Sequence, residues 1–369
     1  MSRTQFYTFI LLYVSALFYL ATTLPIGPHE AWVFYEDHGV LGKLAHLCDG
    51  FFGNQLNFRL PFILSGILNI PLFYLMSKAY FSDVEDSYLA TTIFALLPGI
   101  ITSAVIINIA VIVITMVLGF IIFYEKGQEL FQSFAMILLL FLHDASVIFF
   151  IAVAIFSAYK RNKKLFYFAI LLSIISLLVF NGLDIGGVPK GKFLELFGLY
   201  MVLFSPLVFF YFFYALYRIW LKEKKDILWY ISFTAFVFSI VLSFRQRVIM
   251  TDFAPYVIVS VVLMLVTYHK TVYVRLPQFQ KNYKLGYQIV MGSLILSSLA
   301  IIFHALLFYI ISDKTRHFAY PFYEPYWISL ELREIGQNCY TAKNKRAQYQ
   351  LDYYGIGECK DSTVPKIHR

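Results

Sequence analysis

The amino-acid sequence predicts an all-α integral membrane protein with about eleven transmembrane helices. Of its 369 residues, 60% are hydrophobic and 14% are charged, and the mean hydropathy is +0.69. A soluble domain has roughly half apolar and a quarter charged residues, so this composition excludes an ordinary soluble fold. Apolar runs of roughly 15 to 28 residues recur along the chain, and a helix needs about 20 residues to cross a bilayer.

The first apolar run follows Arg3 and ends without a small-x-small cleavage site, so we expect a retained helix rather than a signal peptide. The expected helices, in order, are Thr4 to Thr22, Leu60 to Tyr80, Tyr88 to Leu97, Ser103 to Tyr124, Leu130 to Leu142, Ala145 to Tyr159, Leu165 to Phe180, Phe193 to Trp220, Ile227 to Ser243, Pro255 to Tyr268 and Leu285 to Ile311. The third and fifth are short.

Two breaks in this pattern have two interpretations. Pro98-Gly99 and His143-Asp144 either form tight hairpins between two spans or kink one longer helix, because Pro and Gly punctuate helices in both ways. The count of eleven helices uses the hairpin interpretation at both places.

Basic residues cluster in every second short loop, which predicts the orientation. The clusters lie at Lys160 to Lys164, Arg218 to Lys225 and Lys270 to Lys284, on the same side as Arg3. Short loops rich in Lys and Arg face the cytoplasm, so we expect a cytoplasmic N-terminus in a plasma (inner) membrane. The same clustering accounts for the net charge of +8 without nucleic acid as a partner.

The expected organisation is one transmembrane domain over residues 1–311 and a small extracytoplasmic tail over residues 312–369. An outer loop at residues 23–59 is the other segment long enough to build a site. Cys339 and Cys359 both lie in the tail, and a disulfide between them is expected in an oxidising compartment, whereas Cys48 would stay unpaired. The tail then forms a small stapled cap, or else it is disordered.

Charged side chains gather at the expected outer ends of the helices, where they could act on a lipid-linked phosphate. Arg245 and Arg247 could clamp a phosphate or extend to lipid headgroups, and Lys190 and Lys192 could bind phosphate or belong to a flexible loop. A carboxylate in the same place could take a proton from an acceptor hydroxyl. This combination suits transfer of a group from a lipid phosphate.

Several short motifs carry a resemblance to a known superfamily. A segment with one acidic residue follows the first helix, and an Arg-Leu-Pro stretch opens the second. The matching segments are Gly27 to Tyr35, Phe58 to Gly66, Leu96 to Gly99, Ser243 to Arg247 and Pro255-Tyr256. Over Thr4 to Tyr268 the chain resembles the GT-C glycosyltransferases that use polyprenyl-phosphate sugars, the superfamily of the lipid A aminoarabinose transferase and the protein O-mannosyltransferases.

The resemblance implies a GT-C-like fold and gives roles to individual residues. Glu30 matches the family's first acidic position and becomes the expected general base. Asn108 stands where members often have a second acid, so Asp144, from His143-Asp144-Ala145, is the candidate for the missing carboxylate. Arg59 joins Arg245 and Arg247 in neutralising the leaving phosphate.

No resident metal or cofactor is expected, although a divalent cation is left open. His29, His38, His46 and Cys48 share the first loop, but their spacing fits no standard zinc pattern.

The sequence therefore predicts an inverting membrane glycosyltransferase that moves a sugar from a polyprenyl-phosphate donor to an acceptor glycan, lipid or protein at the outer face. Two other classes stay open. One is a non-catalytic membrane partner derived from the same fold, which Asn108 and the small tail favour. The other is a lipid or polysaccharide transporter, which would need a polar path through the apolar helices.

Overall fold

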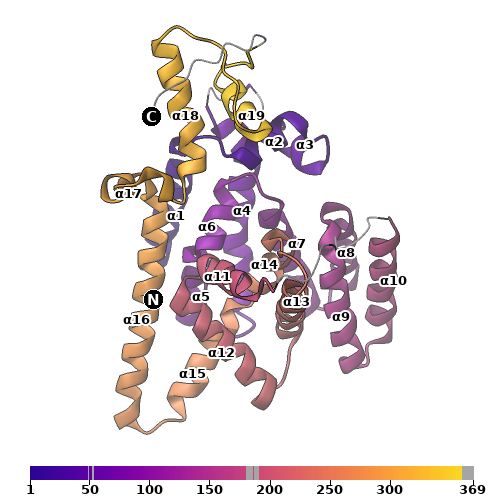
Figure 1. Ribbon diagram of the computed structural model, residues 1–369. Coiled ribbons are helices and arrows are strands. Elements are labelled where there is room, and N and C mark those ends of the chain that lie inside the picture. Colours follow the sequence, from indigo (N-terminus) through magenta and orange to yellow (C-terminus); the bar gives the residue numbers. More distant parts are fainter. Residues whose placement is uncertain (49, 52–53, 180–185, 187–190, 360–369) are drawn as a thin grey trace. The chain divides into compact units, whose positions relative to one another are not determined.

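The computed structural model describes residues 1–48, 50–51, 54–179, 186 and 191–359 (Figure 1). The chain divides into two compact units. Unit 1 comprises residues 1–14, 65–104 and 108–298, and unit 2 comprises residues 15–64, 105–107 and 299–369. The outer loop and the tail, which are far apart in the sequence, therefore belong to the same unit.

All regular elements of the described residues are helices, apart from one isolated bridge between Cys339 and Gly357. Three helices contribute residues to both units: α1 (Arg3–Thr23), α4 (Leu56–Ser77) and α16 (Pro277–Ile302). Unit 1 also contains α5 (Val84–Leu96), α6 (Pro98–Val105, except its last residue), α7 (Ile109–Glu125), α8 (Glu129–Leu142), η1 (Asp144–Ser146), α9 (Val147–Lys160), α10 (Lys163–Val179), α11 (Phe193–Phe204), α12 (Pro206–Lys222), α13 (Ile227–Ser243), α14 (Met250–Ile258) and α15 (Val261–Tyr273). Unit 2 adds α2 (Pro28–Glu36), α3 (Val40–Ala45), α17 (His304–Ile310), η2 (Lys314–Arg316), α18 (Tyr320–Glu334) and α19 (Lys345–Tyr353).

Within the described residues, four helical stretches are long and apolar enough to cross a membrane, or up to six if each of two bent pairs counts as one span. The four are α1, α4, the stretch Met250–Val272 and α16. Large apolar side chains such as Leu11, Leu178 and Leu194 are exposed, as expected for a surface that faces lipid. The prediction of about eleven spans, and of their orientation, stays a prediction.

The chain bends at Pro98-Gly99 instead of forming a hairpin. Helices α5 and α6 meet at an angle of 61°, far from a reversal of direction. Pro98 is the first residue of α6, where its missing N–H costs no helical hydrogen bond. The chain therefore bends without reversing at this position, and the bent pair is either one broken span or a re-entrant segment.

At His143-Asp144 the chain does reverse. Lys164, in the first turn of α10 shortly after α9 ends, pairs with Glu129 at the start of α8, with 3.6 Å between Nζ and Oε2. Helices α8 and α9 each have 14 residues, so the two ends could not meet unless the chain turned back between them. The hairpin interpretation is confirmed here.

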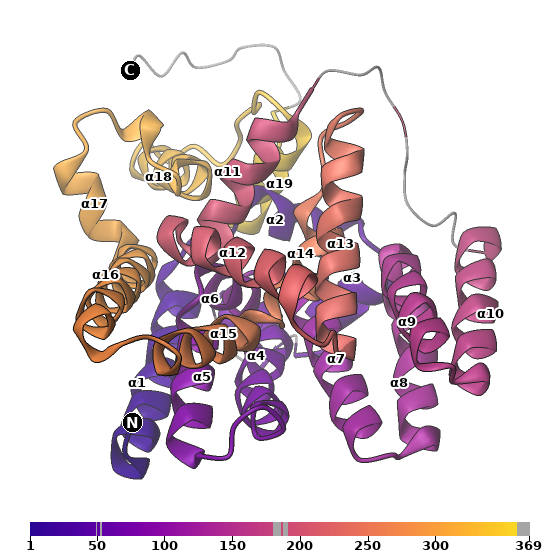
Figure 2. The same cartoon turned by 90° about the horizontal axis from the view of Figure 1, so that it is seen from below.

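The single helix expected from Phe193 to Trp220 is two helices. Helices α11 and α12 meet at 106° (Figure 2). The break falls at Ser205, whose φ is +75°, and Pro206 follows it. Proline disfavours a helical conformation in the residue before it, which explains why one continuous apolar run does not give one helix.

Two contacts fix the helices of unit 1 closely against one another. Gly66 in α4 faces Ala104 in α6, and a Cβ at Gly66 would lie 2.4 Å from the Ala104 Cβ, so only glycine fits. The buried amide of Asn69 donates to the Val111 carbonyl at 3.0 Å and accepts from the Thr115 hydroxyl at 2.8 Å. Small residues and polar bridges of this kind are common where apolar helices pack in membranes.

In unit 2 the tail packs on the outer loop. Helix α19 lies against α2 (Figure 1). Between these helices Tyr349 stacks on Tyr35 and Tyr353 meets Phe34 edge-on. A disulfide joins Cys339 and Cys359, as the sequence predicts. Leu332, Leu351 and Ile356 form a small core beside it. The tail is an ordered cap over the loop within the described residues.

Two buried histidines, His304 and His317, lie near the start of this cap. The His317 Nδ1 accepts from the Ala319 N–H at 3.0 Å, and its Nε2 donates to the His304 carbonyl at 3.1 Å. Burial lowers the pKa of both His317 and His304, because a charged imidazole is poorly solvated there. Protonation of Nδ1 would also remove the acceptor for Ala319.

We therefore expect unit 2 to lose stability as the pH falls below about 6.5, where the unfolded imidazole binds a proton that the folded one does not. Above that pH the contribution is complete. One histidine gives a slope of at most about 1.4 kcal/mol per pH unit. Thermal unfolding between pH 5 and 8 should show a shallower slope for His317→Gln than for the wild type. Equal slopes for the two proteins would contradict this assignment.

Candidate functional site

Glu30 and Arg59, two residues predicted for the active site, form a buried ion pair in unit 2. Both side chains are 0% exposed. The Arg59 Nε donates to Glu30 Oε1 at 2.9 Å, and one terminal nitrogen donates to Oε2 at 2.6 Å. This is the two-pronged geometry in which a guanidinium matches a carboxylate.

Arg59 uses its remaining donors on the backbone. It donates to the carbonyls of Ala21, Leu24 and Pro25, at distances of 2.7 to 2.9 Å. These carbonyls lie at and beyond the C-terminal end of α1, where helical partners run out. With the two bonds to Glu30, all five guanidinium N–H groups are used.

The Glu30 carboxylate is equally saturated. Its Oε2 accepts from the Gly27 N–H at 2.8 Å, which completes a capping box at the start of α2, and its Oε1 accepts from the Ile107 N–H at 3.2 Å. In this arrangement the pair ties α1, α2, α4 and residue Ile107 together. Both side chains are fully paired with protein groups in this structure, and the roles expected for Glu30 as base and Arg59 as phosphate ligand stay predictions.

A second cluster lies in unit 1, where His143 connects two other side chains. Its Nε2 lies 3.4 Å from Asp252 Oδ1, and its Nδ1 lies 3.3 Å from the Tyr256 hydroxyl. A carboxylate beside Nε2 favours the tautomer with the proton on that atom, which leaves Nδ1 to accept from Tyr256. His143 and Tyr256 are buried, whereas the Asp252 side chain is 25% exposed. Asp252 is thus a supported carboxylate that solvent or substrate can reach.

The local sequence explains where His143 and Asp252 lie. His143 follows the last residue of α8 at the hairpin. Asp252 lies in the first turn of α14, where the positive end of the helix dipole stabilises a carboxylate. Asp144, the predicted second carboxylate, is exposed in η1 directly after His143. Asn108 caps α7, its side chain accepting from the Ala110 N–H at 2.9 Å.

Lys192 lies just before α11, and Arg245 and Arg247 lie in the connection that follows α13. Arg247 Nε is 2.6 Å from Glu195 Oε1, and Lys192 Nζ is 3.3 Å from Glu195 Oε2. Glu195 therefore neutralises part of the positive charge that we expected to bind a phosphate. Arg245 is exposed and has no ion pair with any residue that the structure describes. Lys190 lies outside the described residues.

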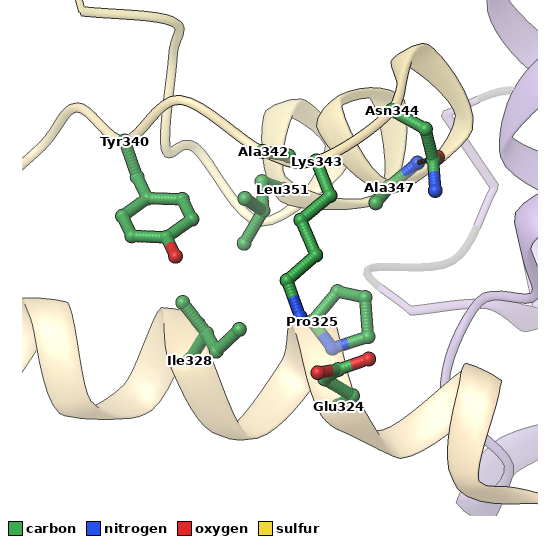
Figure 3. Close-up of a pocket in the computed structure, with 9 residues that line it drawn as sticks. All are labelled: Glu324, Pro325, Ile328, Tyr340, Ala342, Lys343, Asn344, Ala347 and Leu351. Atoms are coloured by element: carbon green, nitrogen blue, oxygen red, sulfur yellow. Dashed lines mark hydrogen bonds between the residues drawn. The ribbon is translucent and has the colours of Figure 1, made fainter. Parts of the chain in front are cut away.

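Two further observations concern where a metal ion or another ligand could bind. Among the described residues, no three His, Cys, Asp or Glu side chains gather as a metal site would require. A cavity of about 250 Å³ lies between α18 and the segment that leads into α19 (Figure 3). Glu324 and Lys343 extend toward one another at its rim, and Ile328 and Leu351 form its apolar side. No residue predicted for the transferase site lines it.

The comparisons give no family. Neither the protein-family models nor the curated proteins contain a match to this chain.

Proposed function

We propose that this chain is a membrane-embedded glycosyltransferase that moves a sugar from a polyprenyl-phosphate donor to an acceptor hydroxyl, with Asp252 as the general base. The supporting observation is the partly exposed Asp252 carboxylate beside His143, in the first turn of α14, which directly follows the connection that carries Arg245. A proton acceptor and a free phosphate ligand thus belong to one short segment. The sequence resemblance to GT-C enzymes supports the choice of donor.

The proposed sugar transfer needs a proton acceptor and a cation that binds the leaving phosphate. The acceptor oxygen forms a bond to the anomeric carbon as the bond from that carbon to the phosphate oxygen breaks. The acceptor proton passes to Asp252, and the electron pair of the broken bond leaves with the phosphate. Arg245 neutralises the charge on this leaving group. Attack from the side opposite the phosphate inverts the anomeric centre.

His143 and Tyr256 act as positioning residues in this proposal. The His143 Nε2 lies 3.4 Å from one carboxylate oxygen and holds it by electrostatic attraction, so the other oxygen can face the acceptor. The base is therefore assigned to Asp252 in place of Glu30, whose oxygens are occupied. Asp144 is the neighbouring carboxylate against which this assignment can be tested.

Arg245 and Arg247 offer a matched pair for testing the phosphate ligand. We expect Arg245→Gln to weaken binding of a radiolabelled polyprenyl-phosphate hexose by about tenfold to a hundredfold, the effect of losing a charged hydrogen bond. Arg247→Gln should weaken it less, because Glu195 already holds that guanidinium. Equilibrium binding to the full chain in nanodiscs measures both. Equal affinities for wild type and Arg245→Gln would contradict the assignment.

A second candidate is a non-catalytic membrane partner. It is favoured by Glu30, which is locked in a structural pair, and by Asn108, which serves as a helix cap. If the chain is such a partner, the wild type should release no polyprenyl phosphate from any donor when a membrane extract supplies the acceptor. Donor-dependent release that needs Asp252 would reject it.

A further inference from the structure

A small apolar cavity lies in unit 1 among α12, α15 and α16, away from the cluster around His143. Its volume is about 250 Å³. Four tyrosines form most of its wall, and the lining comprises Tyr211, Tyr268, Tyr283, Tyr287, Asn282, Gly286 and Val290. Tyr268 and Tyr287 stack with their ring centroids 4.4 Å apart. Such a wall accepts a hydrocarbon chain better than a polar molecule.

Two polar atoms in this wall lack partners. The hydroxyls of Tyr211 and Tyr287 are buried without a hydrogen bond to any described residue. An unsatisfied buried hydroxyl costs about 1–3 kcal/mol. A ligand with acceptor oxygens near these rings, such as ester oxygens, would remove part of that cost after a small movement of the side chains.

Three basic residues contact or adjoin lining residues of the cavity, although none of them belongs to its lining. The Arg275 guanidinium lies 3.6 Å from the centre of the Tyr283 ring and donates to the Tyr283 hydroxyl. Lys281 and Lys284 flank the lining residues Asn282 and Tyr283 and are exposed. Within the described part of the chain, none of these three cations has an acidic partner. Positive charge without an acidic partner beside an apolar cavity suits a phosphate attached to an acyl chain.

We propose that this cavity binds an anionic phospholipid, with one acyl chain against the tyrosine rings and the headgroup phosphate on Arg275, Lys281 and Lys284. Basic pockets between membrane helices on the cytoplasmic side are typical sites for acidic lipid headgroups. The sequence predicts this end of unit 1 to be cytoplasmic. The site does not depend on the glycosyltransferase proposal, since it shares no residue with the proposed catalytic segment.

The glycines of α16 provide a matched pair of variants. A Cβ at Gly286 or at Gly292 would meet nothing within 4 Å, so a larger side chain fits the backbone at both positions. Gly286 lines the cavity and Gly292 does not. Leucine also has a higher helix propensity than glycine, so neither substitution should unfold α16.

Native mass spectrometry of the full chain in detergent tests the proposal, with dioleoyl phosphatidylglycerol and dioleoyl phosphatidylcholine as probes. The wild type should bind phosphatidylglycerol at least about tenfold more tightly. Gly286→Leu should abolish tight binding and Gly292→Leu should retain it. Replacing Arg275, Lys281 and Lys284 together by Gln should remove the preference. Equal affinity for the two lipids, or the same affinity in Gly286→Leu and Gly292→Leu, would overturn the proposal.

Discussion

Arg59→Leu is expected to lower the free energy of unfolding of unit 2 by about 3–5 kcal/mol, the usual result of breaking a buried ion pair. The substitution leaves the Glu30 carboxylate without its cation in a place where neither side chain is exposed. It also strands the carbonyls of Ala21, Leu24 and Pro25. An uncompensated buried charge costs more than the original pair contributes.

Arg245→Leu is the matched control, because this arginine is exposed and has no ion pair with described residues. It should change stability by less than about 0.5 kcal/mol. Thermal unfolding in detergent compares the variants, and hydrogen exchange at Gly27 and Ile107 reports the two amides that donate to Glu30. If Arg59→Leu were as stable as Arg245→Leu, the pair would not hold unit 2 together.

The positions of the helices could largely be predicted from hydropathy alone. The expected helix from Ile227 to Ser243 matches α13, and most other apolar runs match a helix to within a few residues. The breaks between helices were harder to predict, because the hydropathy of the sequence is the same on both sides of Ser205 and of Pro98. Proline marked both sites, but its effect on direction depends on packing that a local pattern does not encode.

The site could be predicted only in part. Glu30 and Arg59 were predicted as general base and phosphate ligand, but Gly27 and Glu30 also have the spacing of a helix N-cap and its third residue, which indicates a structural role. Asp252 was missed, although it lies in the first turn of a helix that was already recognised through Pro255-Tyr256. Its link to His143 joins residues 109 positions apart, which no local pattern reveals.

The second large effect is expected at Asp252. Asp252→Asn keeps the size and a hydrogen-bonding oxygen but removes the proton acceptor, so turnover should fall by about 100-fold to 10,000-fold. Donor affinity should change little, because the carboxylate acts on the acceptor and not on the phosphate. His143→Gln should give a smaller loss, since it only loosens the carboxylate. Asp144→Asn, beside the same hairpin, should stay close to wild type.

The central claim is that Asp252, and not Glu30 or Asp144, takes the acceptor proton. The most direct measurement is the single-turnover rate of polyprenyl phosphate release for wild type, Asp252→Asn and Asp144→Asn in nanodiscs, with donor binding measured on the same samples. We predict a loss of at least about 100-fold for Asp252→Asn alone, with its donor binding intact. A near-normal rate for Asp252→Asn, or an equal loss in Asp144→Asn, would contradict the claim.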